Sequence, residues 1–342
     1  MHVSPAGPGI RPGRGYGAVV DNAARLTVLG SLNMDISVTV RSLPRPGATV
    51  LGSAAVFAPG GKGANQAVAA ARLGGEGLIV ALIGCAGDDD FGRTLRSALR
   101  AEGVDDSAVR TVTGVPTGIA MITVDQAGEN IITVAPGANH ELNVADIAEV
   151  AGDVLVISAE VPVPVISAAL AAAAGRALRV LNLAPAPPEA AELIAAGPEW
   201  LVVNESEAAA ALGRPVSGLT QAAAAAADLV AAGAGNAVVT AGAAGAAYCG
   251  PVGRGHPAGP GQGKTVVVTV PGFKVQATDS VGAGDTFVGA LAVALAAGVR
   301  PADAVTAAAA AGAAAATRPG TQSGMPRPAD VLAVTGHRWP LL

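Results

Sequence analysis

A glycine-rich segment that ends in an acid is the part of the sequence best suited to chemistry. Residues 279–287 read Asp-Ser-Val-Gly-Ala-Gly-Asp-Thr-Phe and lead into an alanine-rich stretch, Phe287–Ala297, that favours a helix. Glycine-rich backbone at a helix N-terminus presents free N–H groups to an anion. Phosphoryl transfer needs such donors together with a base that takes a hydroxyl proton, and Asp285 is placed to be that base. The structural alternative is a glycine-rich turn with an acid that caps the helix.

A second glycine-rich run also precedes an expected helix. Residues 60–66 read Gly-Gly-Lys-Gly-Ala-Asn-Gln. Consecutive glycines allow the backbone to approach a ligand closely, and Lys62 and Asn65 add groups that can bond to hydroxyls. The run is not a dinucleotide fingerprint, because the last glycine of that pattern is replaced by Gln66. The alternative is a tight turn with a solvated lysine.

Polar residues follow the first expected strand, Leu26–Leu29. Asn33 and Asp35 come shortly after it. The carboxyl ends of strands are where open α/β sheets bind ligands, and an aspartate that accepts two hydroxyl hydrogen bonds suits a polyol. The alternative is a loop with a local Asx turn.

Two later strand ends carry further candidates. Asn204 and Glu207 follow Leu201–Val203, and the segment from Thr240 to Gly245 follows Ala237–Val239. Asn204 and Glu207 could organise Mg²⁺ through water, or they could form a capping box at a helix N-terminus. The Thr240–Gly245 segment is glycine-rich and could approach a nucleotide.

Residues 258–265 fit a relaxed phosphate-loop pattern, which we reject. A true phosphate loop follows a strand and opens a helix. Here the β-branched run Val266–Val270 comes next and ends at Pro271, which predicts a strand.

The chain around these motifs alternates short apolar runs with helical patterns. The expected buried strands are Leu26–Leu29, Leu78–Ile83, Val154–Ile157, Arg179–Leu183, Leu201–Val203 and Ala237–Val239. The expected helices between them are Ala64–Leu73, Phe91–Ala101, Val165–Ala174, Glu189–Ala196 and Thr220–Ala232. The alternation predicts an α/β fold, a Rossmann-like, mostly parallel sheet with helices on both faces.

Two stretches break this alternation. Ile36–Phe57 and Thr117–Ala135 alternate apolar with polar residues and contain turn signals, so we expect antiparallel strands exposed on one face that form a small β-sheet lid. The resulting domain picture is a loose, glycine- and proline-rich tail at 1–24 followed by one catalytic domain at 25–335. A glycine- and proline-rich loop at 250–263 is expected to join two strands.

Composition narrows the class of protein. Of the 342 residues 51% are hydrophobic, 14% charged and 2% aromatic, and the formal net charge is −5. The absence of a basic block and of stacking aromatics argues against nucleic acid or an anionic membrane as a partner. Cys85 and Cys249 lack metal-site spacing and are interpreted as buried thiols. Because no apolar run could span a bilayer and the first residues lack a signal-peptide core, we expect a cytoplasmic protein.

Together, the residue 60–66 and 279–287 segments resemble the two signatures of the PfkB-type carbohydrate kinases, in the branch that acts on ribose. The resemblance runs from about Leu26 to Asp330. It implies a sugar site, a nucleotide site and a cation loop. The implied sugar-binding residues are Asn33, Asp35, Gly61, Lys62, Gly63, Asn65 and Glu160, with Asp285 as the base. The implied nucleotide-side residues are Asn204, Thr240, Gly242 and Gly245, and the implied anion hole is Gly282, Ala283 and Gly284. The implied potassium loop is Asp279, Val281, Ala315, Arg318 and Gly320, mostly through backbone carbonyls. For Asp279 the alternative is a turn cap whose charge Arg318 neutralises.

The resemblance further implies ATP-dependent phosphorylation of D-ribose at O5, with ATP, Mg²⁺ and K⁺ as cofactors and a homodimer joined through the lids. The sequence departs from the family pattern at Ala309, where many relatives have a histidine near the adenine, and at Gly324, where some have a serine beside the cation. The 250–263 loop is also longer than usual. The alternatives are a family kinase for another sugar or nucleoside (deoxyribose, fructose, a sugar acid) and a non-catalytic sugar-binding regulator.

Overall fold

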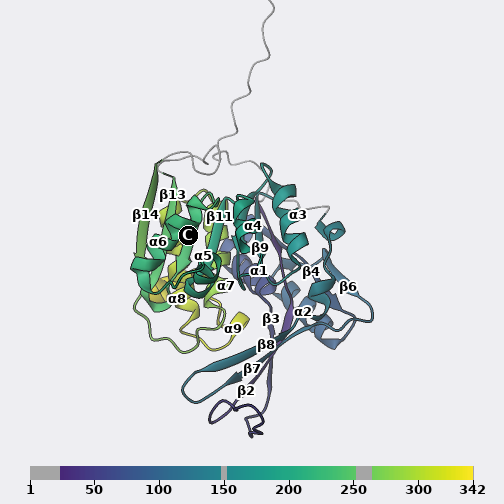
Figure 1. The fold of residues 1–342 in the computed structure, drawn as a ribbon. Coiled ribbons are helices and arrows are strands. Elements are labelled where there is room, and N and C mark those ends of the chain that lie inside the picture. Colours follow the sequence, from purple (N-terminus) through teal and green to yellow (C-terminus); the bar gives the residue numbers. More distant parts are fainter. Residues whose placement is uncertain (1–23, 148–151, 252–263, 342) are drawn as a thin grey trace, which may run out of the picture.

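The structure is a computed structural model that describes residues 24–147, 152–251 and 264–341 (Figure 1). The expected tail, apart from Ala24, and most of the 250–263 loop lie outside the described residues.

A large sheet forms the centre of the molecule. Its strand order is β14-β13-β12-β11-β10-β9-β1-β4-β5, and β6 also pairs with β4. Every pair from β12 to β5 is parallel, and only β12–β13 and β13–β14 are antiparallel. The strands are β1 (Ala24–Leu29), β4 (Leu78–Gly87), β5 (Val104–Asp105), β6 (Val109–Val112), β9 (Val154–Ser158), β10 (Leu178–Asn182), β11 (Trp200–Asn204), β12 (Ala237–Thr240), β13 (Gly245–Pro251) and β14 (Thr265–Pro271). The predicted fold class is confirmed.

Helices cover both faces of this sheet (Figure 1). In β9, Val154 and Val156 belong to one buried cluster and Leu155 and Ile157 to the other, because side chains alternate along a strand. The first cluster includes residues of α1 (Lys62–Gly74), α2 (Asp90–Ala101), α7 (Ala283–Ala296), α8 (Pro301–Ala315) and α10 (Pro328–Thr335). The second includes residues of α3 (Val163–Ala173), α4 (Ala190–Ala195), α5 (Glu205–Leu212) and α6 (Gly218–Ala231). A further short helix is α9 (Thr321–Gly324), and the 3-10 turns are η1 (Gly75–Gly77), η2 (Gly137–Glu141), η3 (Val144–Ile147) and η4 (Gly242–Ala244).

A second sheet, which we call the lid sheet, projects from the main body (Figure 1). It contains β3, β2, β7 and β8 in that order. Their bounds are β2 Asn33–Thr39, β3 Val56–Gly60, β7 Gly118–Val124 and β8 Asn130–Ala135. Antiparallel pairing was expected in this sheet, but β2 pairs with β7 in parallel, because the chain returns to the main sheet between them. The loop with an Asx turn, which was the structural alternative for Asn33 and Asp35, is not found, because both residues lie in β2 at the base of the lid sheet.

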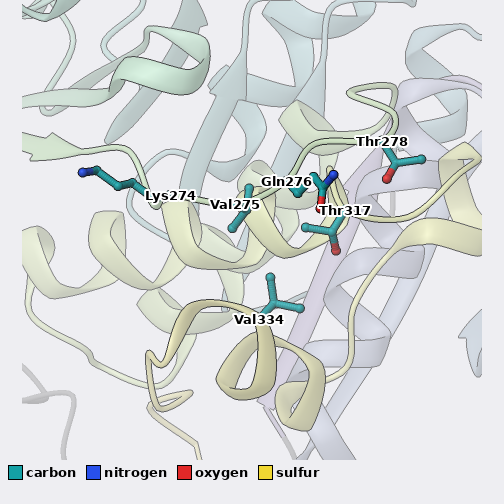
Figure 2. A pocket seen from close by; sticks show the side chains of 6 residues that line it. All are labelled: Lys274, Val275, Gln276, Thr278, Thr317 and Val334. Atoms are coloured by element: carbon teal, nitrogen blue, oxygen red, sulfur yellow. The ribbon is translucent and has the colours of Figure 1, made fainter.

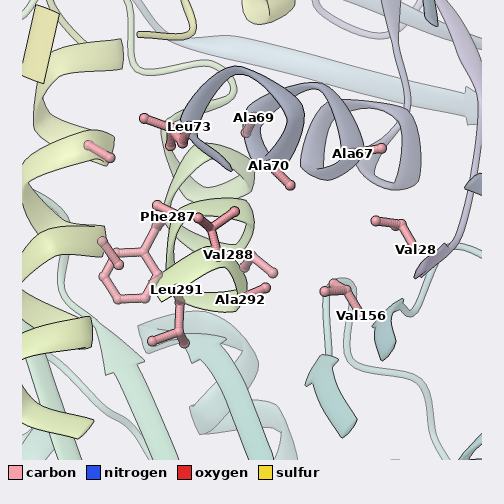
Figure 3. Close-up of a cluster of buried hydrophobic side chains, with 14 of the residues drawn as sticks. Val28, Ala67, Ala69, Ala70, Leu73, Val156, Phe287, Val288, Leu291 and Ala292 are labelled. Carbon is pink, nitrogen blue, oxygen red and sulfur yellow. The ribbon is translucent and has the colours of Figure 1, made fainter. Parts of the chain in front are cut away.

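Helices α1 and α7 pack closely through small residues (Figure 3). Among the labelled side chains of the buried cluster are Ala67, Ala69, Ala70 and Leu73 on α1 and Phe287, Val288, Leu291 and Ala292 on α7. Gly289 lies so near α1 that a Cβ there would stand 2.7 Å from the backbone oxygen of Gln66. Gly289 is one turn beyond Asp285, so this close approach brings Asp285 to the start of α1.

Three further features were considered from the sequence: the two cysteines, possible membrane spans and the segment after the rejected phosphate-loop pattern. Both cysteines are buried. No helix in the described residues is long and apolar enough to cross a membrane. The run that follows the rejected phosphate-loop pattern forms β14, as predicted.

Candidate active site

The candidate site lies where the carboxyl ends of the parallel strands meet. Ser31 and Asn33 follow β1, Glu160 follows β9, Asn182 ends β10, and Asn204 ends β11. Because these strands run parallel in adjacent positions, their polar ends lie along one edge of the sheet. The N-termini of α1 and α7 face the same edge, because Lys62 N bonds to Glu160 and Asn65 bonds to Asp285.

The base of the site combines four acids with one lysine. The pKa of Asp35 is raised from 3.8 to about 7, because the group is buried and because Glu160 and Asp285 are negatively charged neighbours. The pKa of Lys62 is raised, chiefly by the charge of Asp285, with Glu160, Glu207 and Asp35 adding to it. The sequence-predicted Asp35, Lys62, Glu160 and Asp285 therefore share one electrostatic environment.

Asp285 is held by amide side chains from α1. Asn65 Nδ2 donates to its Oδ2 at 2.9 Å, and Gln66 Nε2 donates to its Oδ1 at 3.1 Å. Gln66 Nε2 also donates to Asn182 Oδ1 at 2.9 Å, and Gln322 Nε2 donates to Asn65 Oδ1 at 3.1 Å. The carboxylate is thereby fixed in position at a site where its own side chain is 8% exposed.

Glu160 and the start of α1 are joined through hydrogen bonds. Glu160 Oε2 accepts from Ser31 Oγ at 2.6 Å and from the backbone N–H of Lys62 at 3.1 Å. Helix α1 reaches the end of β1 because both segments have glycine where they meet. A Cβ on Gly63 would stand 2.5 Å from the backbone of Gly30. Gly61, the N-cap residue, has φ 88°, which also favours glycine. The glycines of this run therefore bring α1 onto the strand end.

Asn204 and Glu207 form the capping box that the sequence analysis gave as their structural alternative. Glu207 N donates to Asn204 Oδ1 at 2.9 Å, and Asn204 N donates to Glu207 Oε2 at 2.8 Å. The pKa of Glu207 is raised by burial, against the charge of Lys62, which lowers it. Glu207 is thus both a cap and a carboxyl close to the candidate site.

The remaining nucleotide-side candidates lie at neighbouring strand ends. Thr240 ends β12, and its hydroxyl donates to the backbone oxygen of Val203 at 3.4 Å. Gly242 and Gly245 bound the turn between β12 and β13, and both have positive φ. The turn therefore exposes backbone with no bulky side chain next to the end of β11.

The N-terminus of α7 matches the predicted anion hole in part. Gly282 is the N-cap, with φ 77°, and Gly284 and Asp285 follow in the first turn, where backbone N–H groups have no acceptor within the helix. The N–H of Ala283, by contrast, donates to the backbone oxygen of Ser280 at 3.2 Å. Within the described residues the N–H groups of Gly282, Gly284 and Asp285 have no backbone acceptor.

The predicted cation loops are tied together by Asp279. Its Oδ1 accepts from Val281 N at 3.0 Å and its Oδ2 accepts from Gly320 N at 2.9 Å. The structural alternative, in which Arg318 neutralises Asp279, is wrong, because the guanidinium of Arg318 pairs with Asp330 at 2.6 Å. No group of three or more metal-binding side chains occurs among the residues placed in the structure.

Backbone carbonyls gather around Gly324, in the same loop. A Cβ on Gly324 would stand 3.1 Å from the oxygen of Arg318, 3.5 Å from that of Pro319 and 3.6 Å from that of Ala315. Three backbone oxygens therefore lie near Gly324. Two of them belong to the predicted residues Ala315 and Arg318, and Pro319 was not among the predicted residues.

A cavity of about 410 Å³ lies next to these loops (Figure 2). Its lining residues are Lys274, Val275, Gln276, Thr278, Thr317 and Val334. Thr278 and Thr317 directly precede Asp279 and Arg318, but none of the predicted sugar or nucleotide residues lines the cavity.

Several residues of the site were missed by the sequence analysis. Ser31, Gln66, Asn139, Asn182 and Gln322 all bond to predicted residues or support them. Gln66 had a signal, since it stands in the glycine-rich run next to Asn65. Asn139 and Gln322 had none, because they are distant in sequence from the residues they contact.

The fold and the site define an α/β protein with a carboxylate and free amides at a glycine-rich helix start, a class that includes sugar kinases. The family model for pfkB family carbohydrate kinases matches residues 23–328. The chain belongs to that family.

Individual relatives agree with this placement. The chain is 36% identical to ribokinase of Haemophilus influenzae over 320 residues, which cover 91% of this chain and 98% of the relative. It is 34% identical to ribokinase of Bacillus subtilis over 309 residues, 88% of this chain and 96% of the relative. Among solved structures, Thermotoga maritima ribokinase has a TM-score of 0.75 at 31% identity, covering 91% of this chain and 98% of that one. Arabidopsis thaliana ribokinase complexed with ribose and ATP also has a TM-score of 0.75, at 28% identity, covering 92% and 99%.

Proposed function

We propose that this protein transfers the γ-phosphoryl group of ATP to O5 of D-ribose, giving D-ribose 5-phosphate. The observation that carries the proposal is Asp285, fixed by two amides beside the free N–H groups of α7. The full-length similarity to ribokinases of several organisms supports ribose as the sugar.

In this proposal the residues divide between the sugar and the phosphate. Asn33, Asp35, Lys62 and Glu160 bind the sugar hydroxyls, while Gly61, Gly63 and Asn65 place the start of α1 against the sugar. Asp285 takes the proton of the attacking hydroxyl, and the backbone N–H groups at the start of α7 hold negative charge on the transferring group. The lid sheet excludes water from the hydroxyl.

The nucleotide and its metal ions would lie along the next strand ends. Asn204, Thr240, Gly242 and Gly245 line the nucleotide side, and Mg²⁺ held through water by Asn204 and Glu207 would offset phosphate charge. Each Glu207 oxygen accepts one hydrogen bond, which leaves a lone pair for a bound water. Carbonyls around Gly324 together with Asp279 would hold K⁺, whose bound charge supports the loop that leads into α7. We further propose a cytoplasmic homodimer joined through the lid sheets.

The test is a coupled assay of ADP release with a panel of sugars and nucleosides, in which ribose is expected to be the best substrate. Asp285→Ala should lower kcat roughly 10²–10⁴-fold, because it removes the general base. Ribose binding by calorimetry should persist, since the other hydroxyl partners remain. Asp285→Asn is the isosteric control, and it should be as inactive as the alanine variant.

Three results would contradict the proposal. If Asp285→Ala turned over substrate at the wild-type rate, Asp285 would not be the general base. If fructose or a nucleoside were a better substrate than ribose, the assignment of ribose as the substrate would be wrong. Sugar binding without any turnover would favour a regulator over an enzyme.

A further inference from the structure

Asn139, in η2 directly after the lid sheet, makes hydrogen bonds that fix its orientation. Leu32 N donates to Asn139 Oδ1 at 2.9 Å, and Asn139 Nδ2 donates to the backbone oxygen of Leu32 at 3.0 Å. A backbone N–H can only donate and a backbone carbonyl can only accept. The amide of Asn139 therefore has one allowed orientation, with its nitrogen towards the carbonyl of Leu32.

That orientation in turn fixes the amide of Asn33. The same Asn139 Nδ2 donates its second hydrogen to Asn33 Oδ1 at 2.8 Å, in a place where both residues are 2% exposed. If Asn33 turned over, two NH₂ groups would face each other, which loses the hydrogen bond. Within the described part of the chain no acceptor is bonded to Asn33 Nδ2, so this nitrogen is left for a ligand.

The strand that passes this bond has no side chain there. A Cβ on Gly118, the first residue of β7, would stand 2.2 Å from Asn33 Oδ1 and 2.3 Å from Asn139 Nδ2. Glycine at this position leaves space for the two amides to meet. The bond thus connects β2 to the segment that follows β8, next to the start of β7 at the base of the lid sheet.

We propose that Asn139 is a positioning residue that holds Asn33 as a hydrogen-bond donor towards the sugar, so that the site selects a sugar oxygen that can accept. The inference rests on the proposed function. Asp35 lies two residues beyond Asn33 on the same face of β2, and as a carboxylate it accepts hydrogen bonds. A hydroxyl between them would accept from Asn33 and donate to Asp35. A protonated amino group at that position would have no lone pair for Asn33.

The test uses the isosteric variant Asn139→Asp. The new carboxylate would still accept from Leu32 N, but it would repel Asn33 Oδ1, so Asn33 would turn its nitrogen to residue 139 and its oxygen to the sugar. We expect the KM for ribose to rise about 10-fold or more, in line with the loss of one or two buried hydrogen bonds. The KM for ATP should change less than about 2-fold, because within the described residues the side chain of Asn139 bonds to Leu32 and Asn33 and to no nucleotide-side candidate.

A double-mutant cycle separates positioning from a structural role. If Asn139 acts through Asn33, then Asn139→Asp should raise the ribose KM less than about 2-fold in the Asn33→Ala background. Gly118→Ala reaches the same bond from β7 and should reproduce the effect of Asn139→Asp, including its loss in the Asn33→Ala background. Thermal unfolding and the ATP KM of each variant report folding. Gly118→Ala keeps the cycle available if Asn139→Asp does not fold.

Ribose analogues give an independent readout. With one hydroxyl at a time replaced by fluorine or by hydrogen, the wild type should prefer fluorine at one position, because fluorine accepts from a donor and cannot donate. Asn139→Asp should lose that preference.

Two outcomes would overturn the inference. In the first, Asn139→Asp raises the ribose KM by the same factor in the Asn33→Ala background as in the wild type. In the second, Asn139→Asp folds and has the wild-type ribose KM. A wild-type protein that turns over no sugar at all would instead contradict the proposed function. If another sugar is the substrate, the same cycle is measured with that sugar.

Discussion

Asp35 lies in an environment that opposes its charge. It is 9% exposed and faces Glu160 and Asp285, and only Lys62 acts in the opposite direction. Such a cluster is unfavourable in the ligand-free protein, and it would become favourable if sugar hydroxyls donate to the carboxylates as proposed. In that proposal, Asp35 binds the sugar at the expense of stability.

This gives a pH-dependent prediction. A carboxyl whose pKa is raised from 3.8 to about 7 binds more protons in the folded protein than in the unfolded chain between those values. Stability is therefore retained at low pH and falls as pH rises towards about 7. Asp35→Asn removes the charge, so at pH 8 it should stabilise the ligand-free protein by something on the order of 1–4 kcal/mol. At pH 5 the gain should shrink, because wild-type Asp35 is then largely neutral.

Urea unfolding at the two pH values measures the difference, with Glu76→Gln on an exposed turn as the matched control. The control should show no gain at either pH. Equal stability of Asp35→Asn and wild type at pH 8 would contradict the prediction. The ribose affinity of Asp35→Asn should be lower at pH 8, since the amide accepts hydrogen bonds less strongly than a carboxylate.

At the residue scale, the sequence was informative where residue type alone indicates chemistry. Asp285 and Lys62 were predicted from charge next to glycine, and Asp35 was predicted from its place after the first strand. The structure brings the three together. Ser31 and Asn139 were not predicted, because each acts through hydrogen bonds to predicted residues and a single sequence does not show contacts. The structural alternative in which Arg318 neutralises Asp279 was wrong for the same reason.

At the scale of elements, the contact between α1 and α7 determines the geometry of the candidate base. Gly289 on α7 and Ala69 on α1 allow the helices to approach, so that Asn65 and Gln66 reach Asp285. Arg72, in the last turn of α1, donates to the backbone oxygens of Gln322 and Met325 at 2.7 Å each. Helix α9, and with it the loop at Gly320, is thereby attached to α1, the helix that we propose contacts the sugar.

The two loops joined by Asp279 lead to a prediction about potassium. If carbonyls near Gly324 hold K⁺, the ion fixes the segment before α7 and so preorganises its N–H groups. Activity should be higher in potassium than in sodium or tetramethylammonium at matched ionic strength. Asp279→Ala should remove this difference, because it breaks the bonds to Val281 N and Gly320 N.

Asp303→Ala is the control for this experiment, since it removes an acid from the far end of α8. It should keep the response to potassium. Equal rates of the wild type in all three buffers would assign these loops a structural role only.

Elements were easier to predict from the sequence than their pairing. The strands buried on both faces were recognised because Val, Ile and Leu dominate them, as in β9, and the alternation with helices indicated parallel pairing. The pairing within the lid sheet was wrong at β2–β7, since turn signals show local hairpins and give no information about strands far apart in sequence. The start of β2 at Asn33 was also missed, because the predicted stretch began at Ile36 and a polar residue begins the strand. The start of β7 at Gly118 agrees with the predicted stretch, which began at Thr117.

On the scale of the whole molecule, the lid sheet exposes apolar side chains on both of its faces. Paired residues of neighbouring strands point to the same side, so Ile132 and Val134 share the face of Asp35 through their partners Ile122 and Ala120. Ile132 is 50% exposed and Val134 45%. The opposite face carries Phe57, Met121 and Ile131, at 57%, 50% and 47%. A sugar at the base of one face would cover little of this surface.

We therefore expect a homodimer in which the lid sheets of two copies cover each other, because symmetric dimers are the commonest oligomers and extended apolar patches mark interfaces. Light scattering at micromolar concentration should give twice the chain mass. Met121→Asp and Ile132→Asp place a charge on opposite faces, and the variant on the buried face should yield monomers. Val144→Asp is the matched control, since Val144 is 52% exposed in η3, outside the lid sheet, and this variant should stay dimeric. A fully active wild-type monomer would show that the apolar lid surface serves another purpose.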